Sequence, residues 1–298
     1  MHNAKQHHFV PRWYLEGFTD PNSGYLQVYD KIIKKYRIQK PDKVMKINKY
    51  YMQEWASEGV DPNILERLAG ELIEPRAKNA FKHLLTIPSD FTPEETSVIL
   101  VYLEFQRIRV PRQARIAQQL IESSIFKQAT SDFINSYLKG QITISESARF
   151  EYMRQVSGKI IPYFTRMKWD IVKASKGSSF TTTDSPVSFY NPEFSPPAEA
   201  GLRFAGTKVL FPLSSELMLI MRHPEYGIDS KVSPKMLIPE PENRDDGIEI
   251  TFHPEPIIED IVNQYNWLLV ELSDRTVVGN CMYVLEKCIV TVPKINKA

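Results

Sequence analysis

The stretch WDIVKASKGSSFTTTDSPVSFY, residues 169–190, marks the point where the sequence changes from helical to strand periodicity. Short apolar runs separated by Gly, Ser and Pro predict strands at 169–174, 179–183 and 187–190. Further strands are predicted at 207–211, 216–221 and 282–292, with one helix among them at 256–269. Residues 169–292 are therefore expected to form the strand-rich part of the fold.

Before this stretch, residues 62–165 have the spacing of amphipathic helices. Leu65, Leu68 and Leu72 recur at three- and four-residue intervals, and Pro75 predicts a kink or a break in their helix. Another helix is expected to begin after Thr92, because threonine, proline and glutamate then occupy the cap, first and third positions. We expect a helical block over about 62–165.

The N-terminal region has strand character again, at 24–29 and 36–39. Strands followed by helices and then by strands predict an α+β fold, with a helical block packed on a mostly antiparallel sheet. We expect the N- and C-terminal strands to build that sheet together. The chain, residues 1–298, is predicted to be a single domain.

Composition excludes several classes of protein. With 42% hydrophobic and 24% charged residues, the chain is neither disordered nor fibrous, and its net charge of +1 creates no strong overall field. Its two cysteines, Cys281 and Cys288, form no disulfide framework or zinc motif, which favours a cytoplasmic protein. No apolar run is long enough to span a bilayer, so no membrane partner is expected. The chain also lacks P-loop, dinucleotide-binding and serine-hydrolase motifs.

Adjacent histidines open the first motif that suggests chemistry, His7-His8-Phe-Val-Pro11-Arg12. Histidine binds metal ions and transfers protons near neutral pH. Adjacent side chains point in different directions in a strand or a helix, so one histidine is expected to act while the other has a structural role. The alternative is a pair that is merely solvated or hydrogen-bonded.

Three further motifs supply acids and an arginine. Glu66 lies beside the apolar stripe of its helix, where a buried carboxylate needs a charged or metal partner, and Glu74 follows it. Gln106 and Arg109 stand three residues apart and share a helix face. Asp184 ends a strand before Ser-Pro, a place that suits a catalytic carboxylate and plain turn chemistry equally.

Charge is concentrated in two segments. Residues 31–49 hold eight Lys or Arg and one Asp, a net charge of +7, among several tyrosines. Such a mixture is typical of non-specific nucleic-acid surfaces, in which Lys34 and Lys35 would contact phosphates. Residues 240–260 hold eight acids and one Arg, a net charge of −7. The two segments either face each other or are solvated.

The same residues resemble a widespread bacterial family of unknown function. That family opens with H-H-x-x-P-x-x-x-L, found here at 7–15. Its later motifs resemble the stretch from Leu65-Glu66 to Glu74, the Gln106–Arg109 pair, the turn at 183–187 and Pro-Leu-Ser at 212–214. This chain has Asp-Ser-Pro where the usual member has Asp-Asn-Pro. The resemblance covers about residues 6–280 and implies a set of site residues but no activity.

These residues lead to three hypotheses of function. The first is a hydrolase of phosphodiesters, most simply a nuclease in a bacterial defence or toxin-like setting. The second is a non-catalytic module that binds nucleic acid or protein, in which the polar residues form a structural network. The third is a hydrolase of a small phosphorylated ligand. A divalent metal is one option for the cofactor.

In the first hypothesis each polar residue has an assigned role. The expected catalytic residues are His7, His8, Glu66 and Asp184. The same four and Glu74 are the candidate metal ligands. Arg109, with Gln106, is expected to hold phosphate together with Arg12, Lys34 and Lys35.

Overall fold

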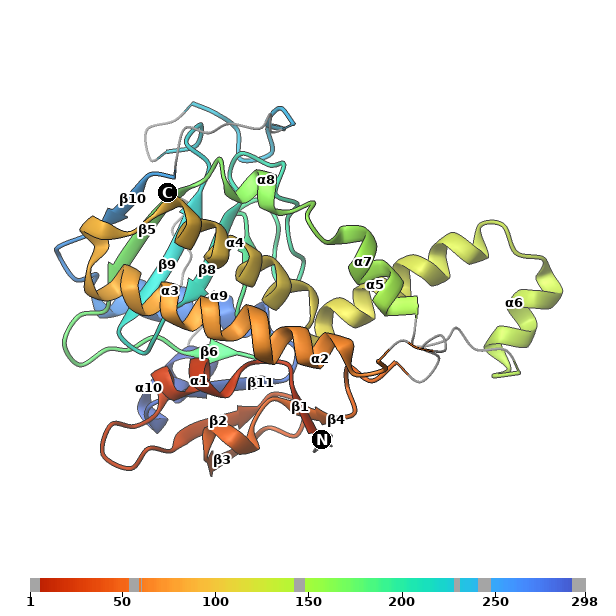
Figure 1. The fold of residues 1–298 in the computed structure, drawn as a ribbon, viewed down its shortest axis with the longest axis horizontal. Coiled ribbons are helices and arrows are strands. Elements are labelled where there is room, and N and C mark those ends of the chain that lie inside the picture. The colour runs from red at the N-terminus through yellow and green to blue at the C-terminus, as the bar shows by residue number, and fades with distance from the viewer. Residues whose placement is uncertain are drawn as a thin grey trace.

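The computed structural model describes residues 6–53, 59, 61–141, 148–227, 231–240 and 248–290. Its fold is α+β, as expected: helices cover both faces of a five-stranded sheet, and a smaller sheet joins the two ends of the chain (Figure 1). The helical block precedes the strand-rich part in the predicted order. Within the described residues, no helix combines the length and the apolar character needed to cross a membrane.

The larger sheet has the strand order β10-β5-β9-β8-β7. Its strands are β5 (Lys168–Lys173), β7 (Ser188–Tyr190), β8 (Lys208–Pro212), β9 (Leu217–Arg222) and β10 (Ile250–Phe252). All neighbouring strands are antiparallel except β10 and β5. Alternation along β5 sends Trp169 and Ile171 into one core and Val172 into another, so both faces of the sheet are buried.

The smaller sheet, in the order β3-β2-β11-β6, confirms that the two ends of the chain pair with each other. It consists of β2 (Leu26–Asp30), β3 (Lys35–Gln39), β6 (Thr182–Thr183) and β11 (Thr276–Gly279). Strands β1 (Gln6–His8) and β4 (Lys46–Asn48) form a separate antiparallel pair. This pairing fixes the first described residues to the fold.

The strand predicted at 282–292 is wrong where the structure describes it, because Met282–Val290 form helix α10. Val284, Leu285 and Cys288 are buried, whereas Glu286 and Lys287 are exposed. That spacing gives one apolar face at helical periodicity, and the face packs on the smaller sheet. Cys288 therefore acts as a small hydrophobic residue. Residues 291–292 lie outside the described residues.

The main core lies between the larger sheet and two long helices, α3 (Glu74–Thr86) and α4 (Pro93–Ile108) (Figure 1). The predicted start of α4 is confirmed by reciprocal bonds: Glu95 N donates to Thr92 Oγ1 at 3.2 Å, and Thr92 N donates to Glu95 Oε2 at 3.0 Å. Short helix α2 (Ile64–Leu68) leads into α3 through a π-helical turn, Ala69–Ile73. Helix α1 (Arg12–Leu15) and a 3₁₀ turn, Glu16–Phe18, lie beneath them.

The remaining helices complete the other layers. Helix α9 (Glu259–Glu271) covers the second face of the larger sheet. Helices α5 (Pro111–Phe126) and α6 (Ser131–Leu138) extend away from the body as an arm, and α7 (Ala148–Val156) returns along α5 (Figure 1). Helix α8 (Ile161–Phe164) then leads into β5. Further 3₁₀ turns lie at Pro41–Lys43 and Pro88–Asp90.

Candidate functional site

The N-terminal segment that carries the two histidines is buried in the fold. Phe9, Tyr14 and Phe18 are among its side chains in the main core. His7 is buried as well, and its Nδ1 accepts a 2.9 Å hydrogen bond from the backbone N–H of Tyr51. The His7 and Tyr51 rings stack with centroids 5.7 Å apart. His7 therefore contributes to holding the segment in place, which leaves the more exposed His8 as the freer histidine.

Gln106 and Arg109 meet at the C-terminal end of α4, as their spacing predicts. Arg109 Nε donates to Gln106 Oε1 at 2.9 Å, and Gln106 Nε2 donates to the Phe9 carbonyl at 2.9 Å. Arg109 Nη1 also donates to Glu74 Oε1 at 2.8 Å. The guanidinium is fully buried, so these bonds fix its position between the helical block and the N-terminal segment.

The polar groups around Arg109 are incompletely paired. Among the described residues, four of their buried atoms have no hydrogen-bond partner: Arg109 Nη2, Tyr51 Oη, Tyr102 Oη and His8 Nε2. An unpaired buried polar atom costs about 1–3 kcal/mol, and folded proteins leave few of them. We name the set formed by these four residues with Glu66, Glu74 and Gln106 the Arg109 cluster.

Electrostatic coupling shows that the cluster is one unit. The charge of Arg109 acts on Tyr51, Tyr102 and Glu66, and the charge of Glu74 acts on the same three residues. Glu74 also acts on His8. Tyr51 and Arg109 line a small cavity of about 10 Å³ with Tyr50, Gln113 and Tyr152, so space adjoins two of the four residues with unpaired atoms.

Two members of the cluster, Glu66 and His8, have shifted pKa values. Burial raises the pKa of Glu66 to about 7, with Arg109 opposing the shift and Glu74 adding to it. Burial and the nearby Lys46 lower the pKa of His8. A partly protonated carboxyl group therefore lies near the buried Arg109 guanidinium, and the neutral form of His8 is favoured beside Glu74.

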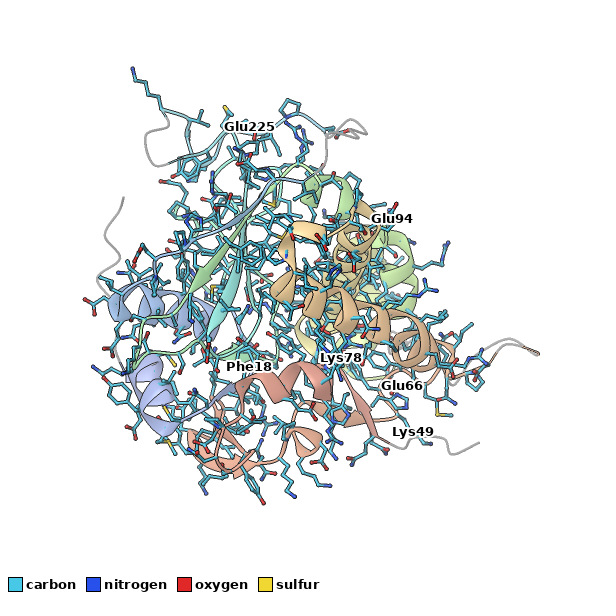
Figure 2. The ribbon with its side chains drawn as sticks, turned by 60° about the vertical axis from the view of Figure 1, so that its left-hand side comes forward. Phe18, Lys49, Glu66, Lys78, Glu94 and Glu225 are labelled. Carbon is cyan, nitrogen blue, oxygen red and sulfur yellow. The ribbon has the colours of Figure 1, made fainter. Side chains whose placement is uncertain are left out.

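The π-helical turn explains how two carboxylates of one helix reach the same place. Glu66 precedes the turn at Ala69–Ile73, and Glu74 follows it directly before Pro75. In a regular α-helix, two side chains that are eight residues apart differ in direction by about 80°. A π-turn accommodates one extra residue, so Glu66 and Glu74 are related by about seven α-helical steps and differ by about 20°. Figure 2 shows Glu66 where this helix meets the N-terminal layer that holds Lys49.

Asp184 has a different environment. Its carboxylate accepts hydrogen bonds from the backbone N–H groups of Asp274, Arg275 and Thr276, at 2.9, 2.7 and 2.7 Å. Burial raises its pKa to about 6, and the three N–H donors act in the opposite direction. These bonds fasten the turn before β11 to the end of β6. The structure thus gives Asp184 the turn role and does not bring it into the Arg109 cluster.

The other predicted site residues lie at the surface. Arg12 is exposed and pairs with Glu16 at 2.9 Å. Lys34 and Lys35 are exposed at the turn between β2 and β3. Among the described residues, no three His, Cys, Asp or Glu side chains gather closely enough to hold a metal ion. The candidate metal ligands therefore do not form one coordination site in that part of the chain.

The basic segment 31–49 is mostly exposed, and its lysines flank apolar side chains. Ile32 is 68% exposed and Ile38 is 59% exposed. Lys31 differs from its neighbours, because its Nζ donates to the carbonyls of Val270 and Ser273. Described members of the acidic segment pair elsewhere: Glu240 with Arg203 and Glu249 with Lys168. Where the acidic segment is described, these ion pairs do not join it to the basic segment.

Sequence reasoning missed the two tyrosines of the cluster. Tyr102 lies on the apolar face of α4, where its spacing predicts an ordinary core residue. Tyr51 follows the basic segment, where it resembles one of several surface aromatics. The available signal is a tyrosine at a core position, because a buried tyrosine hydroxyl usually needs a hydrogen-bond partner.

These features define a class of α+β proteins with a buried arginine at the junction of an N-terminal His-His segment and a helical block. A family model, described as a protein of unknown function (DUF4238), matches residues 6–281, so the chain belongs to that family. No curated protein and no solved structure matches the chain.

Proposed function

We propose that the protein hydrolyses phosphodiesters at the Arg109 cluster, with nucleic acid as the first-choice substrate. The observation that carries the proposal is the set of four buried polar atoms without partners around one arginine. Arginine N–H and tyrosine O–H groups donate hydrogen bonds, and phosphate oxygens accept them. A phosphodiester at this point would supply the acceptors that the protein leaves out.

The proposed roles follow from charge and pKa. Arg109 Nη2 and the hydroxyls of Tyr51 and Tyr102 hold the phosphate oxygens and stabilise the charge that develops in the transition state. His8, whose pKa is lowered, takes a proton from the attacking water. Glu66, with a pKa of about 7, gives a proton to the leaving oxygen.

The exposed basic segment supports a polymeric substrate. Lysines between β2 and β4 would attract a phosphate backbone and guide it to the N-terminal layer that carries His8. A small phosphorylated ligand would need the Arg109 cluster but no such surface. Comparing a short dinucleotide with a longer strand separates these two substrates.

A binding module is the second candidate function, and specific bonds favour it. Gln106 holds the Phe9 carbonyl, and His7 accepts the Tyr51 N–H. Both bonds attach the N-terminal segment to the body, which is what a structural polar network does. In this case the basic segment binds nucleic acid or an acidic protein, and the chain has no hydrolytic activity.

The test uses the full chain and end-labelled single- and double-stranded DNA and RNA, with added divalent metal or with a chelator. We expect cleavage of at least one substrate and a loss of about 10²–10⁴-fold in His8→Ala, without a lower melting temperature. His253→Ala is the matched control, because His253 is 44% exposed and pairs with Asp170 outside the cluster. The chelator arm shows whether the reaction needs a metal.

Two outcomes would overturn the proposal. One is binding of the labelled strands without cleavage in either arm, which supports the binding module. The other is cleavage that persists in full in a folded His8→Ala protein, which places the chemistry elsewhere.

A further inference from the structure

A second, larger cavity lies on the other side of the α4–α5 corner from the Arg109 cluster. It has a volume of about 570 Å³, opens to the surface, and is lined by this corner, α7, the turn before α8 and residues 197–201. Binding sites for small molecules commonly have volumes of about 300–1,000 Å³. The cavity is therefore large enough for a metabolite-sized ligand, and the proposed hydrolysis makes no use of it.

The charged groups of this cavity leave an excess of positive charge. Arg107, Arg112 and Lys159 line it, and Glu199 is the acid among the lining residues. Glu199 is committed to Arg107, since its two oxygens accept bonds of 2.9 and 2.5 Å from that guanidinium. With three cations and one acid, the lining keeps a net positive charge, which Arg112 and Lys159 present to an incoming anion.

Arg112 is held in place by neutral groups. Its Nη1 donates to the Leu272 carbonyl at 2.7 Å, and its Nη2 donates to the Pro197 carbonyl at 2.6 Å. Its buried Nε has no hydrogen-bond partner among the described residues and lies 3.8 Å from Glu199 Oε2. The two carbonyls thus fix the guanidinium without neutralising its positive charge. Its Nε–H group remains a hydrogen-bond donor without a partner among the described residues.

Lys159 is positioned by the backbone on either side of it. The Glu104 carboxylate accepts the N–H groups of Gly158 at 2.7 Å and Ile160 at 2.8 Å, which fixes the turn. The Lys159 side chain is exposed and forms no ion pair with a described residue. A flexible cation on a fixed turn beside a cavity is well placed to close over an anionic group.

Most of the remaining lining is apolar, with Gln113 and Tyr152 as polar exceptions. Ile108, Ile116, Val156 and Phe189 contribute aliphatic and aromatic surface to the same cavity. Burying a ligand's apolar surface against these walls is favourable. A ligand that covers the apolar walls and neutralises the excess positive charge needs an apolar body and an anionic head.

We propose that this cavity binds a small amphipathic anion, a carboxylate or phosphate monoester attached to an acyl or aryl group. The anionic head lies between Arg112 and Lys159, and the apolar body lies against Ile116 and Val156. The ligand neutralises the excess positive charge and covers the apolar walls. This cavity adjoins the one beside Arg109, with which it shares Ile108, Gln113 and Tyr152, but its proposed ligand contacts neither Arg109 nor Tyr51.

Isothermal titration calorimetry on the full chain tests the proposal with octyl phosphate, octanoate and octanol. We expect one of the two anions to bind at least about tenfold more tightly than octanol, and the comparison between them identifies the preferred head group. Equal binding of octanol, or no binding of either anion, would overturn the proposal.

Two variants locate the site. Ile116→Trp fills the cavity and should abolish binding, whereas Leu120→Trp, one turn further along α5 at a position 53% exposed, should not change it. Lys159→Gln, at an exposed position where folding is not at risk, should weaken anion binding about two- to fivefold and leave octanol unaffected. Anion binding unchanged in Lys159→Gln and in a folded Ile116→Trp protein would place the ligand elsewhere.

Discussion

Arg109 and Asp184 are both buried charged side chains, 1% and 4% exposed, and the sequence marks both as site candidates. Asp184 finds its partners in one turn, where three backbone N–H groups bind its carboxylate. Arg109 keeps an unpaired Nη2, and the nearby hydroxyls of Tyr51 and Tyr102 are unpaired too. Burial of a charge therefore does not by itself distinguish the two roles. The two sites differ in how completely they are hydrogen-bonded: the complete set around Asp184 fastens a turn, and the incomplete set around Arg109 leaves the donors that we propose bind a ligand.

The largest expected effect on stability belongs to Asp184. Asp184→Ala leaves three N–H groups without an acceptor, one of them fully buried, and we expect it to lower the free energy of unfolding by about 3–5 kcal/mol. Urea unfolding followed by circular dichroism measures this loss. A variant as stable as the wild type would show that the Asp184 turn is not fastened in this way.

Glu66 should show a smaller effect with a distinctive pH dependence. Its pKa of about 7 in the folded chain exceeds the ordinary 4.5, so folding favours the protonated form. The stability that this group contributes is complete below about pH 4.5 and is lost as the pH rises through 7. Because Glu66 is partly exposed, we expect Glu66→Gln to be more stable than the wild type by only about 1–2 kcal/mol at pH 8.

Urea unfolding of both proteins between pH 4 and pH 8 checks this difference. The wild type and Glu66→Gln should have similar stability at pH 4 and diverge as the pH rises. If the two curves stay parallel, Glu66 does not have a raised pKa. If the rate of phosphodiester cleavage by the wild type changes with pH near pH 7, that change should be absent from Glu66→Gln.

The basic segment should contribute the smallest effect, on binding alone. Lys34→Ala with Lys35→Ala should reduce the salt dependence of nucleic-acid binding by about 0.7–0.9 log unit for each phosphate that the variant no longer neutralises. Fluorescence anisotropy at several salt concentrations measures this slope. Lys127→Ala with Lys139→Ala, on the arm, is the matched control, and an equal reduction in that control would remove the special role of the basic segment.

The sequence predicts the architecture well because periodicity and capping are local signals. The α+β class and the start of α4 after Thr92 follow from such signals. The prediction of a strand at 282–292 is wrong because the buried residues Val284, Leu285 and Cys288 have the spacing of a helix within a short apolar segment. Short apolar runs suit a buried strand and a buried helix almost equally.

The candidate site could be predicted only in part. The contact between Gln106 and Arg109 can be predicted from their helical spacing. The bond from Gln106 to the Phe9 carbonyl joins residues far apart in the sequence, so no local pattern predicts it. The unpaired hydroxyl of Tyr102 is invisible in sequence, because a core tyrosine and a site tyrosine occupy the same apolar stripe. The role of Asp184 depends on where residues 274–276 lie in space.

The central claim is that the unpaired groups around Arg109 serve a ligand, and a pair of tyrosine variants tests it most directly. Tyr102→Phe removes a buried hydroxyl that has no partner among the described residues. Tyr14→Phe removes one that bonds to Thr182 Oγ1 at 2.7 Å and to the Pro212 carbonyl at 2.8 Å. Both changes delete the same atom from a fully buried ring.

Melting temperature and phosphodiester cleavage are measured on the same preparations of the two variants. We predict that Tyr102→Phe keeps or raises the melting temperature and loses about 10–10³-fold in cleavage rate, because a donor to the phosphate is gone. Tyr14→Phe should lose about 1–3 kcal/mol of stability and keep its cleavage rate while folded. A Tyr102→Phe protein that is destabilised and cleaves at the wild-type rate would contradict the claim.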